Sequence, residues 1–112
     1  MDARDAERTA AFFADDVRIA FGNRPVITGR ESARSSFSEA ATAFRAVRHD
    51  TTGVWTGHDG EYQVVSVEAQ VTYTLLDDRS VTVPCTSTLR IRDELIADYR
   101  VFIDITPVFA TA

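Results

Sequence analysis

The sequence has few of the residues that mark a disulfide scaffold, a metal centre or a membrane segment. Its 112 residues include one cysteine, Cys85, so no disulfide can form within the chain. Two histidines without a cysteine cluster give no metal-ligand spacing, and there is no glycine-rich phosphate loop. No apolar run approaches the roughly 20 residues of a membrane span, and the N-terminus is charged where a signal peptide is apolar. We expect a cytoplasmic protein with no cofactor and no metal site.

Positive charge is also in the minority. The chain has 12 Lys and Arg residues against 17 Asp and Glu residues, a formal net charge of −5. An acidic domain without a basic stripe is a poor partner for nucleic acid or an anionic membrane, so we expect neither. The hydrophobic share of 45% is that of an ordinary globular protein. This length predicts a single domain over residues 1–112 with one core.

The first half of the chain predicts two helices and a strand. Asp5 can cap a short helix with Ala6, Ala10 and Phe13 on one face, ending near residues 14–16. Residues 17–21 alternate between apolar and polar, which is typical of a strand with one buried face. Thr28 and Glu31 have the spacing of a capping box, and a helix from about residue 29 to residue 44 follows with one apolar face.

The second half changes to a period of two. Strands are predicted over residues 46–57, 65–75, 81–91 and 95–103, with turns at Asp59-Gly60, at residues 77–79 and at residues 92–94. Pro84 interrupts one ladder and predicts a bulge or a sheet edge there. Hairpin-joined strands with separate helices indicate an α+β domain whose helices cover the apolar face of the sheet.

At this point the pattern resembles a known family. The stretches "FFADDVRIAFGNRPVITGRESARSSF", "VRHDTTGVW" and "VTVPCTSTLRIRDELIADYRVFID" resemble SnoaL-like proteins of the nuclear transport factor 2-like superfamily, from about Ala10 to Pro107. The resemblance implies a cone-shaped fold in which a strongly curved, mixed and mostly antiparallel sheet wraps around helices and leaves a pocket. It also implies a shortened N-terminal helical part, because relatives carry a longer helix before the "FADD" segment.

Relatives include ketosteroid isomerases, limonene epoxide hydrolases and polyketide cyclases, so the resemblance alone assigns no activity. It places the isomerase base near Phe21, the oxyanion-stabilising aspartate at Ser87 and the hydrolase or cyclase aspartate at Val101. None of the three is a carboxylate. Losing a general base typically removes about 10²–10⁴-fold in rate. Whether the chain is an enzyme therefore stays open.

The apolar parity of the strands predicts a pocket with a few hydrogen-bonding tips, although the same residues also describe a plain hydrophobic core. The inferred lining consists of Phe13, Phe21, Phe37, Phe44, Trp55, Val71, Val83, Cys85, Leu89 and Val101. The candidate catalytic groups are Tyr73 or Tyr99 as donor, Ser87 as oxyanion partner, and His49 as base. Cys85 reads as a buried small hydrophobe rather than a nucleophile.

Three hypotheses follow. The first is a domain that binds an apolar small molecule in this pocket, with weak non-carboxylate isomerase or cyclase chemistry as an extension. The second is a non-catalytic interaction module that forms a homodimer through the outer sheet face near Arg100 and Phe102. The third is an enzyme whose acid is Asp104, which requires a bulge before Ile103 to turn that carboxylate inward.

Overall fold

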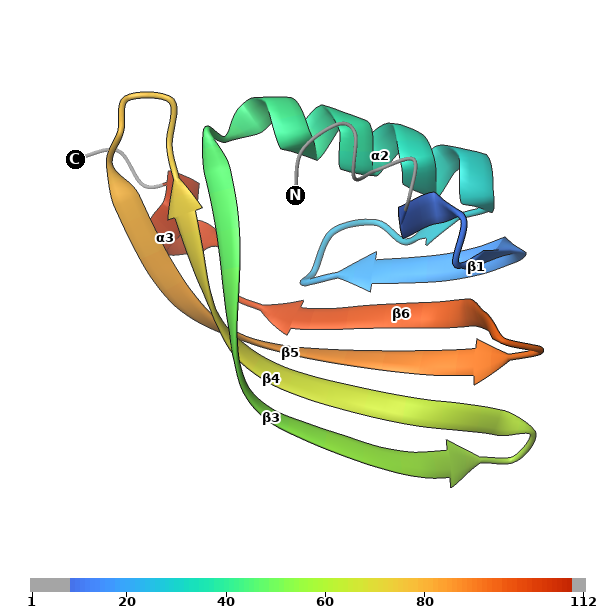
Figure 1. Cartoon of the computed structure of the whole chain (residues 1–112). Helices are drawn as coiled ribbons and strands as arrows, with labels where there is room; N and C mark the ends of the chain where they lie inside the picture. The colour runs from blue at the N-terminus through green and yellow to red at the C-terminus, as the bar shows by residue number, and fades with distance from the viewer. Residues whose placement is uncertain (1–8, 110–112) are drawn as a thin grey trace.

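The computed structural model describes residues 9–109 and has one six-stranded sheet with helices on its concave side (Figure 1). The strand order is β2-β1-β6-β5-β4-β3, and β1 pairs with β6 in parallel while the other neighbours are antiparallel. The predicted α+β class with a curved, mixed and mostly antiparallel sheet is confirmed. The strands are β1 (Phe13–Phe21), β2 (Ile27–Thr28), β3 (Ala46–Asp59), β4 (Tyr62–Thr74), β5 (Ser80–Arg92) and β6 (Leu95–Ile103), and the helices are α2 (Arg30–Ala43) and α3 (Thr106–Phe109).

Helix α2 lies across the concave side of the sheet and packs against β1 and β2 (Figure 1). Its bounds agree with the helix predicted over residues 29–44. The predicted capping box is wrong, because the N-cap is Gly29 and no side chain caps the helix. Gly29 has a φ of 97°, a conformation that other residues adopt only with strain. Glu31 pairs with Arg34 instead.

The first strand begins earlier than predicted. Phe13, which we placed on the first helix, opens β1 and is a parallel ladder partner of Ile96. The backbone N–H of Ile96 donates to the carbonyl of Phe12 at 2.8 Å, so β6 draws this segment into the sheet. Among the described residues of the predicted helix, Thr9 and Ala10 are helical. Asp5 and Ala6 lie outside the described residues.

Strands β4 and β5 follow the predicted alternation, and Pro84 shows how a central strand tolerates proline. Pro84 pairs in register with Gln70 on β4, so there is no bulge at that point. The β5–β6 ladder ends at Cys85, the partner of Ile103. Beyond Cys85, β5 is a local edge on its β6 side, where the missing N–H of proline costs no ladder hydrogen bond. The edge alternative was therefore correct.

Two register shifts turn side chains to faces that a strict period of two would not give them. On β3 the register shifts between Thr51 and Gly53, so Trp55 pairs with Ser66 and leaves the face shared by Val47 and His49. Trp55 is 56% exposed, which corrects its assignment to the pocket lining. Its indole lies over Gly53, where an added Cβ would come within 2.4 Å of the ring.

The second shift falls between Arg90 and Ile91 and makes Ile96 the partner of Ile91. Ile96 packs into the core, whereas Ala97 lines a cleft on the other face. The predicted apolar parity of β6 is therefore right from Tyr99 onward and wrong at Ala97. A β-bulge has this effect because one extra residue reverses the alternation that follows it.

The core consists of two clusters. The α2 cluster joins the start of β1 to helix α2, and its buried members are Ala10, Phe13, Val17, Ile19 and Ala33. The α3 cluster joins the far ends of β4 and β5 to helix α3, and its buried members are Val71, Tyr73, Val83, Cys85 and Val108. Half-buried side chains lie between the two clusters on the concave face.

Replacing Phe13 by alanine tests how much of the stability resides in the α2 cluster. Phe13 is fully buried and contacts the rings of Phe37 at 5.8 Å and Tyr99 at 6.4 Å. We expect Phe13→Ala to lower the free energy of unfolding by about 3–5 kcal/mol, because it leaves a cavity. Urea denaturation measures this. The matched control is Phe12→Ala, since Phe12 is 59% exposed; equal losses in the two variants would contradict the described core.

Candidate functional site

A row of cross-strand partners runs over the concave face between the two core clusters. Phe21 pairs with Val101 on the parallel ladder, Val101 pairs with Ser87, and Ser87 pairs with Val67. We call Phe21, Val101, Ser87 and Val67 the concave row. The three positions at which the resemblance placed catalytic acids, Phe21, Ser87 and Val101, are thus neighbours in space. With Val67 they form a row across four adjacent strands. No member of the row is a carboxylate.

Uncharged side chains that can form hydrogen bonds surround this row. Tyr99 and Cys85 lie on either side of Ser87 along the same face, and the Cys85 Sγ is 3.7 Å from the Ser87 Oγ. Burial, with Cys85 nearby, raises the pKa of Tyr73 to about 12. Burial also raises the pKa of Tyr99, while the Ser87 side chain acts in the opposite direction. Both tyrosines are therefore protonated donors at neutral pH.

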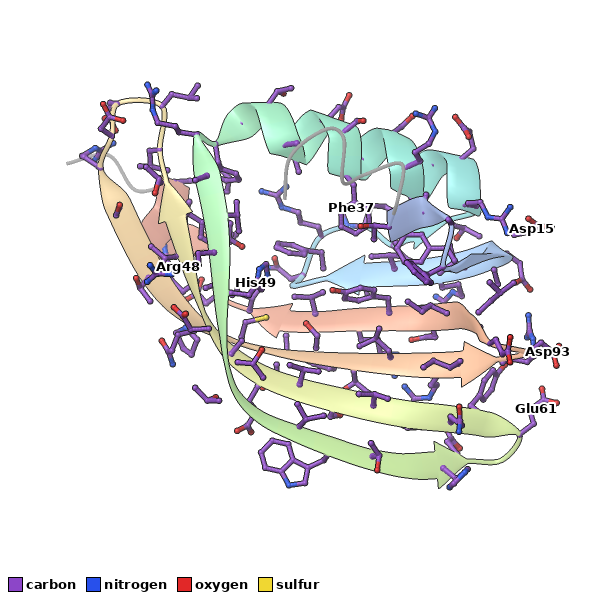
Figure 2. The ribbon with its side chains drawn as sticks, in the orientation of Figure 1. Asp15, Phe37, Arg48, His49, Glu61 and Asp93 are labelled. Atoms are coloured by element: carbon purple, nitrogen blue, oxygen red, sulfur yellow. The ribbon has the colours of Figure 1, made fainter. Side chains whose placement is uncertain are left out.

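His49 faces the concave side, as predicted. Figure 2 shows His49 and Arg48 pointing to opposite sides of β3, with His49 on the inner side. His49 pairs with Val71 in the ladder, and its residue is exposed at the outer strand of the sheet. Partial burial lowers the pKa of His49, so its neutral form predominates near pH 7. A neutral imidazole can accept a proton or a hydrogen bond.

The structure divides the predicted lining residues into core and surface. Phe13, Val71, Val83 and Cys85 are buried in the two clusters, which favours the core alternative for them. Phe37 packs on Phe13, and Phe44 packs on Tyr73 at 4.8 Å between ring centroids. Phe21, Leu89 and Val101 are half-buried, as are Ser87 and Tyr99. The candidate site is thus the half-buried concave row with Leu89, Tyr99 and His49.

Asp104 does not join this site. It follows the end of β6, is exposed, and its Oδ1 accepts the backbone N–H of Thr106 at 3.0 Å. Hydrogen bonding from the side chain of Thr106, and then from its backbone N–H, lowers the pKa of Asp104. Ile103 pairs with Cys85 in the normal register, so the bulge that an inward Asp104 requires is not there. The carboxylate instead caps the turn into α3.

Sequence reasoning placed Arg100 on the outer sheet face, but it did not foresee that four arginines gather in one cleft there. Arg18, Arg90, Arg92 and Arg100 line a cleft of about 370 Å³ together with Asp16, Asp59 and Asp98. The signal was present, since Arg18, Arg90 and Arg100 occupy outward positions on predicted strands. The alternation of residues did not reveal that β1 pairs with β6 in parallel, and this pairing brings Arg18 beside Asp98.

The described residues contain no helix that is long and apolar enough to cross a membrane. Within residues 9–109, no three His, Cys, Asp or Glu side chains are grouped as they would be around a metal ion.

Comparison with known proteins supports the fold. The sequence profile of the SnoaL-like domain family matches residues 1–99. No curated protein matches the sequence. A nuclear transport factor 2-like protein of unknown function from Burkholderia pseudomallei is 17% identical with a TM-score of 0.79, and the match covers 94% of this chain and 82% of that one.

Two further solved structures have stated chemistry. The epoxide hydrolase/cyclase-like enzyme SalBIII, with a role in pyran ring formation in the polyether salinomycin, is 20% identical with a TM-score of 0.73, covering 93% of this chain and 85% of its own. TerC, co-crystallised with polyporic acid, is 16% identical with a TM-score of 0.75, covering 94% of this chain and 83% of its own. At these identities the likeness shows the fold.

The protonation of His49 can be checked directly. We expect its NMR titration midpoint to lie below the reference value of 6.5, because partial burial disfavours the charged ring. Stability should then fall as the pH drops below 6.5, since the unfolded chain takes up this proton more readily than the folded one. His49→Gln should remove the signal and reduce that pH dependence. A midpoint at or above 6.5 would refute the description of His49 as a desolvated ring.

Proposed function

Because the chain belongs to the SnoaL-like domain family, we propose that its concave face binds an apolar small molecule carrying a carbonyl or hydroxyl group. The main support is one observation: uncharged hydrogen-bonding groups lie beside half-buried apolar side chains on the concave face. Phe21, Val101 and Leu89 offer apolar area, while Ser87 and Tyr99 offer hydroxyl groups. Small-molecule sites commonly combine apolar area with a few such polar groups.

The residues of the row favour binding over the chemistry of carboxylate enzymes. Moving a proton beside a carbonyl requires a base, and Phe21 and Val101 cannot serve as one. His49 is a neutral imidazole on this face, and Tyr99 with Ser87 could donate to a developing oxyanion. Any isomerase- or cyclase-type activity would therefore be weak and would depend on His49.

The stated chemistry of two proteins with this fold indicates a ligand class. SalBIII takes part in closing a pyran ring, and TerC was crystallised with polyporic acid. We therefore expect a cyclic compound of polyketide, terpene or steroid size with at least one oxygen substituent. Such a molecule would lay its rings on the concave row and direct its oxygen at Tyr99 and Ser87.

Thermal shift against a panel of steroids, polyketides and terpenes tests the proposal. Cys85 is a useful probe, because it is the single cysteine of the chain and lies beside Ser87. A bound ligand should raise the melting temperature and slow the reaction of Cys85 with a thiol reagent. Tyr99→Phe should weaken binding by about two- to tenfold, the worth of one neutral hydrogen bond.

Tyr62→Phe is the matched control, because Tyr62 lies in the convex cleft and its hydroxyl meets Arg92 at 3.5 Å. Affinity should be unchanged in that variant. The proposal would be wrong if no compound of the panel raised the melting temperature. It would also be wrong if Tyr99→Phe and Tyr62→Phe lowered the ligand affinity equally.

A second candidate function is homodimerisation through the convex face. The exposed apolar side chains favour it, since Phe102 is 59% exposed and Trp55 is 56% exposed. Aromatic and arginine side chains are enriched at protein interfaces, and Arg100 lies two residues before Phe102. This function needs no ligand on the concave face.

The double variant Arg100→Glu with Phe102→Asp tests the dimer. If the convex face is the interface, buried like charges should convert dimers to monomers, which analytical ultracentrifugation measures. The matched control is Arg79→Glu with Leu76→Asp, since Leu76 is 61% exposed in the β4–β5 hairpin. An unchanged mass in the first variant, or a change in both, would exclude this interface.

A further inference from the structure

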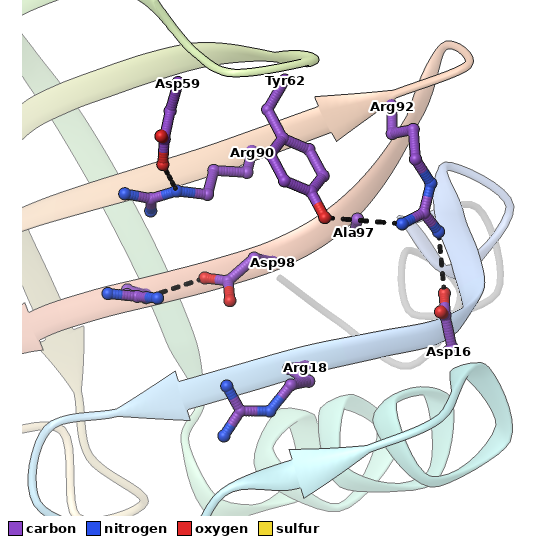
Figure 3. A pocket seen from close by; sticks show the side chains of 9 residues that line it. Asp16, Arg18, Asp59, Tyr62, Arg90, Arg92, Ala97 and Asp98 are labelled. Carbon is purple, nitrogen blue, oxygen red and sulfur yellow. Dashed lines mark hydrogen bonds and ion pairs between the residues drawn. The ribbon is translucent and has the colours of Figure 1, made fainter.

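The convex cleft gathers arginines from strands that are far apart in the sequence. Arg18 comes from β1, Arg100 from β6, and Arg90 and Arg92 from β5 (Figure 3). Three aspartates share the cleft, so its formal charge is positive in a chain whose net charge is −5. The concave row, by contrast, contains no charged side chain.

Asp98 is the centre of the arrangement. It is the ladder partner of Arg18 on one side and of Arg90 on the other, and its Oδ1 accepts from the Arg100 Nε at 2.9 Å. The side chain of Asp98 is only 15% exposed. One carboxylate therefore lies among three guanidinium groups, and its single negative charge can neutralise only one of their three positive charges.

The remaining donors of these arginines are available. Arg90 bonds Asp59 through Nε at 2.9 Å, and Arg100 bonds Asp98 through Nε, so neither uses its terminal nitrogens in a hydrogen bond within residues 9–109. Arg18 has no ion pair or side-chain hydrogen bond in this part of the chain, and Figure 3 shows its guanidinium group without a dashed line. Arg92 differs, because it is held by Asp16 at 3.2 Å and by Tyr62.

We propose that this cleft binds a small oxyanion, the phosphate or carboxylate group of a small molecule, between Arg18, Arg90 and Arg100. The planar guanidinium group presents paired donors that match both kinds of anion. The anion would neutralise the excess charge around Asp98 and would occupy the free terminal nitrogens. This site lies on the face of the sheet opposite to the concave row and is independent of the ligand binding proposed there. It shares Arg100 with the proposed dimer face, so the two proposals are alternatives for the convex side.

Titration with inorganic phosphate, followed by the Arg Nε–H NMR signals at constant ionic strength, tests the site. The signals of Arg18, Arg90 and Arg100 should shift together and saturate, while that of Arg79 in the distant β4–β5 hairpin should not move. A parallel titration with succinate distinguishes a carboxylate from a phosphate ligand. Arg18→Gln should weaken the binding of the better probe about tenfold or more, since it removes charge-assisted hydrogen bonds.

Asp98→Asn provides a test of opposite sign. It removes the carboxylate that competes for the three arginines, so it should strengthen phosphate binding. Asp77→Asn makes the same change of net charge at an exposed position that pairs with Arg79, and it should leave the affinity unchanged. A gain in both variants would mean that net charge alone governs binding.

Three further results would overturn the proposal. The first is saturable binding of neither probe, and the second is equal weakening by Arg18→Gln and Arg79→Gln. The third is an Arg18 signal that depends on protein concentration rather than on phosphate, which would mark the cleft as a contact between two copies of the chain. Circular dichroism of each variant separates these results from a loss of folding.

Discussion

The parallel ladder between β1 and β6 is the interaction on which the rest of the structure depends. It pairs Arg18 with Asp98 and Phe21 with Val101, although these residues lie at opposite ends of the chain. Helix α2 packs against β1 and β2, so its position over the concave side follows from this pairing. Closing so long a loop costs conformational entropy, and the burial of Phe13, Val17 and Ile19 offsets that cost.

Both candidate sites are built across this ladder, one on each face of the sheet. On the concave side the ladder places Phe21 next to Val101 and extends the row that leads to Ser87. On the convex side it places Arg18 next to Asp98. The concave site is apolar and uncharged, whereas the convex cleft is rich in charge. The two faces therefore suit different ligands and do not compete.

Sequence reasoning was most successful where one physical rule acted over many residues. The alternation of β4 and β5 continues without a register shift along their common ladder, so the inward parity of Tyr73, Cys85 and Ser87 could be predicted. Helix α2 was predicted for the same reason, since its apolar spacing persists for several turns. The parity argument also placed Phe21, Ser87 and Val101 on one face, and the structure makes them neighbours.

The errors arose where a local event changed the rule. One extra residue near Thr51 on β3 sends Trp55 to the convex face, and nothing in the alternation announces it. The position of Phe13 in the sequence suits the apolar face of a helix as well as it suits a strand. The backbone N–H of Ile96 donates to the carbonyl of Phe12, and this hydrogen bond draws Phe13 into the sheet. Local patterns cannot reveal such contacts, because the partner lies far along the chain.

The sequence by itself determined which side chains could meet the interior and that no acid would occupy the three working positions of the resembled enzymes. Those properties follow from residue identity and from the period of two along each strand. Only the tertiary structure decided which strands are neighbours, and hence that Asp98 would lie among three arginines. Backbone hydrogen bonds join the strands, and they are the same for every residue except proline, so the alternation along one strand does not identify its partner strand.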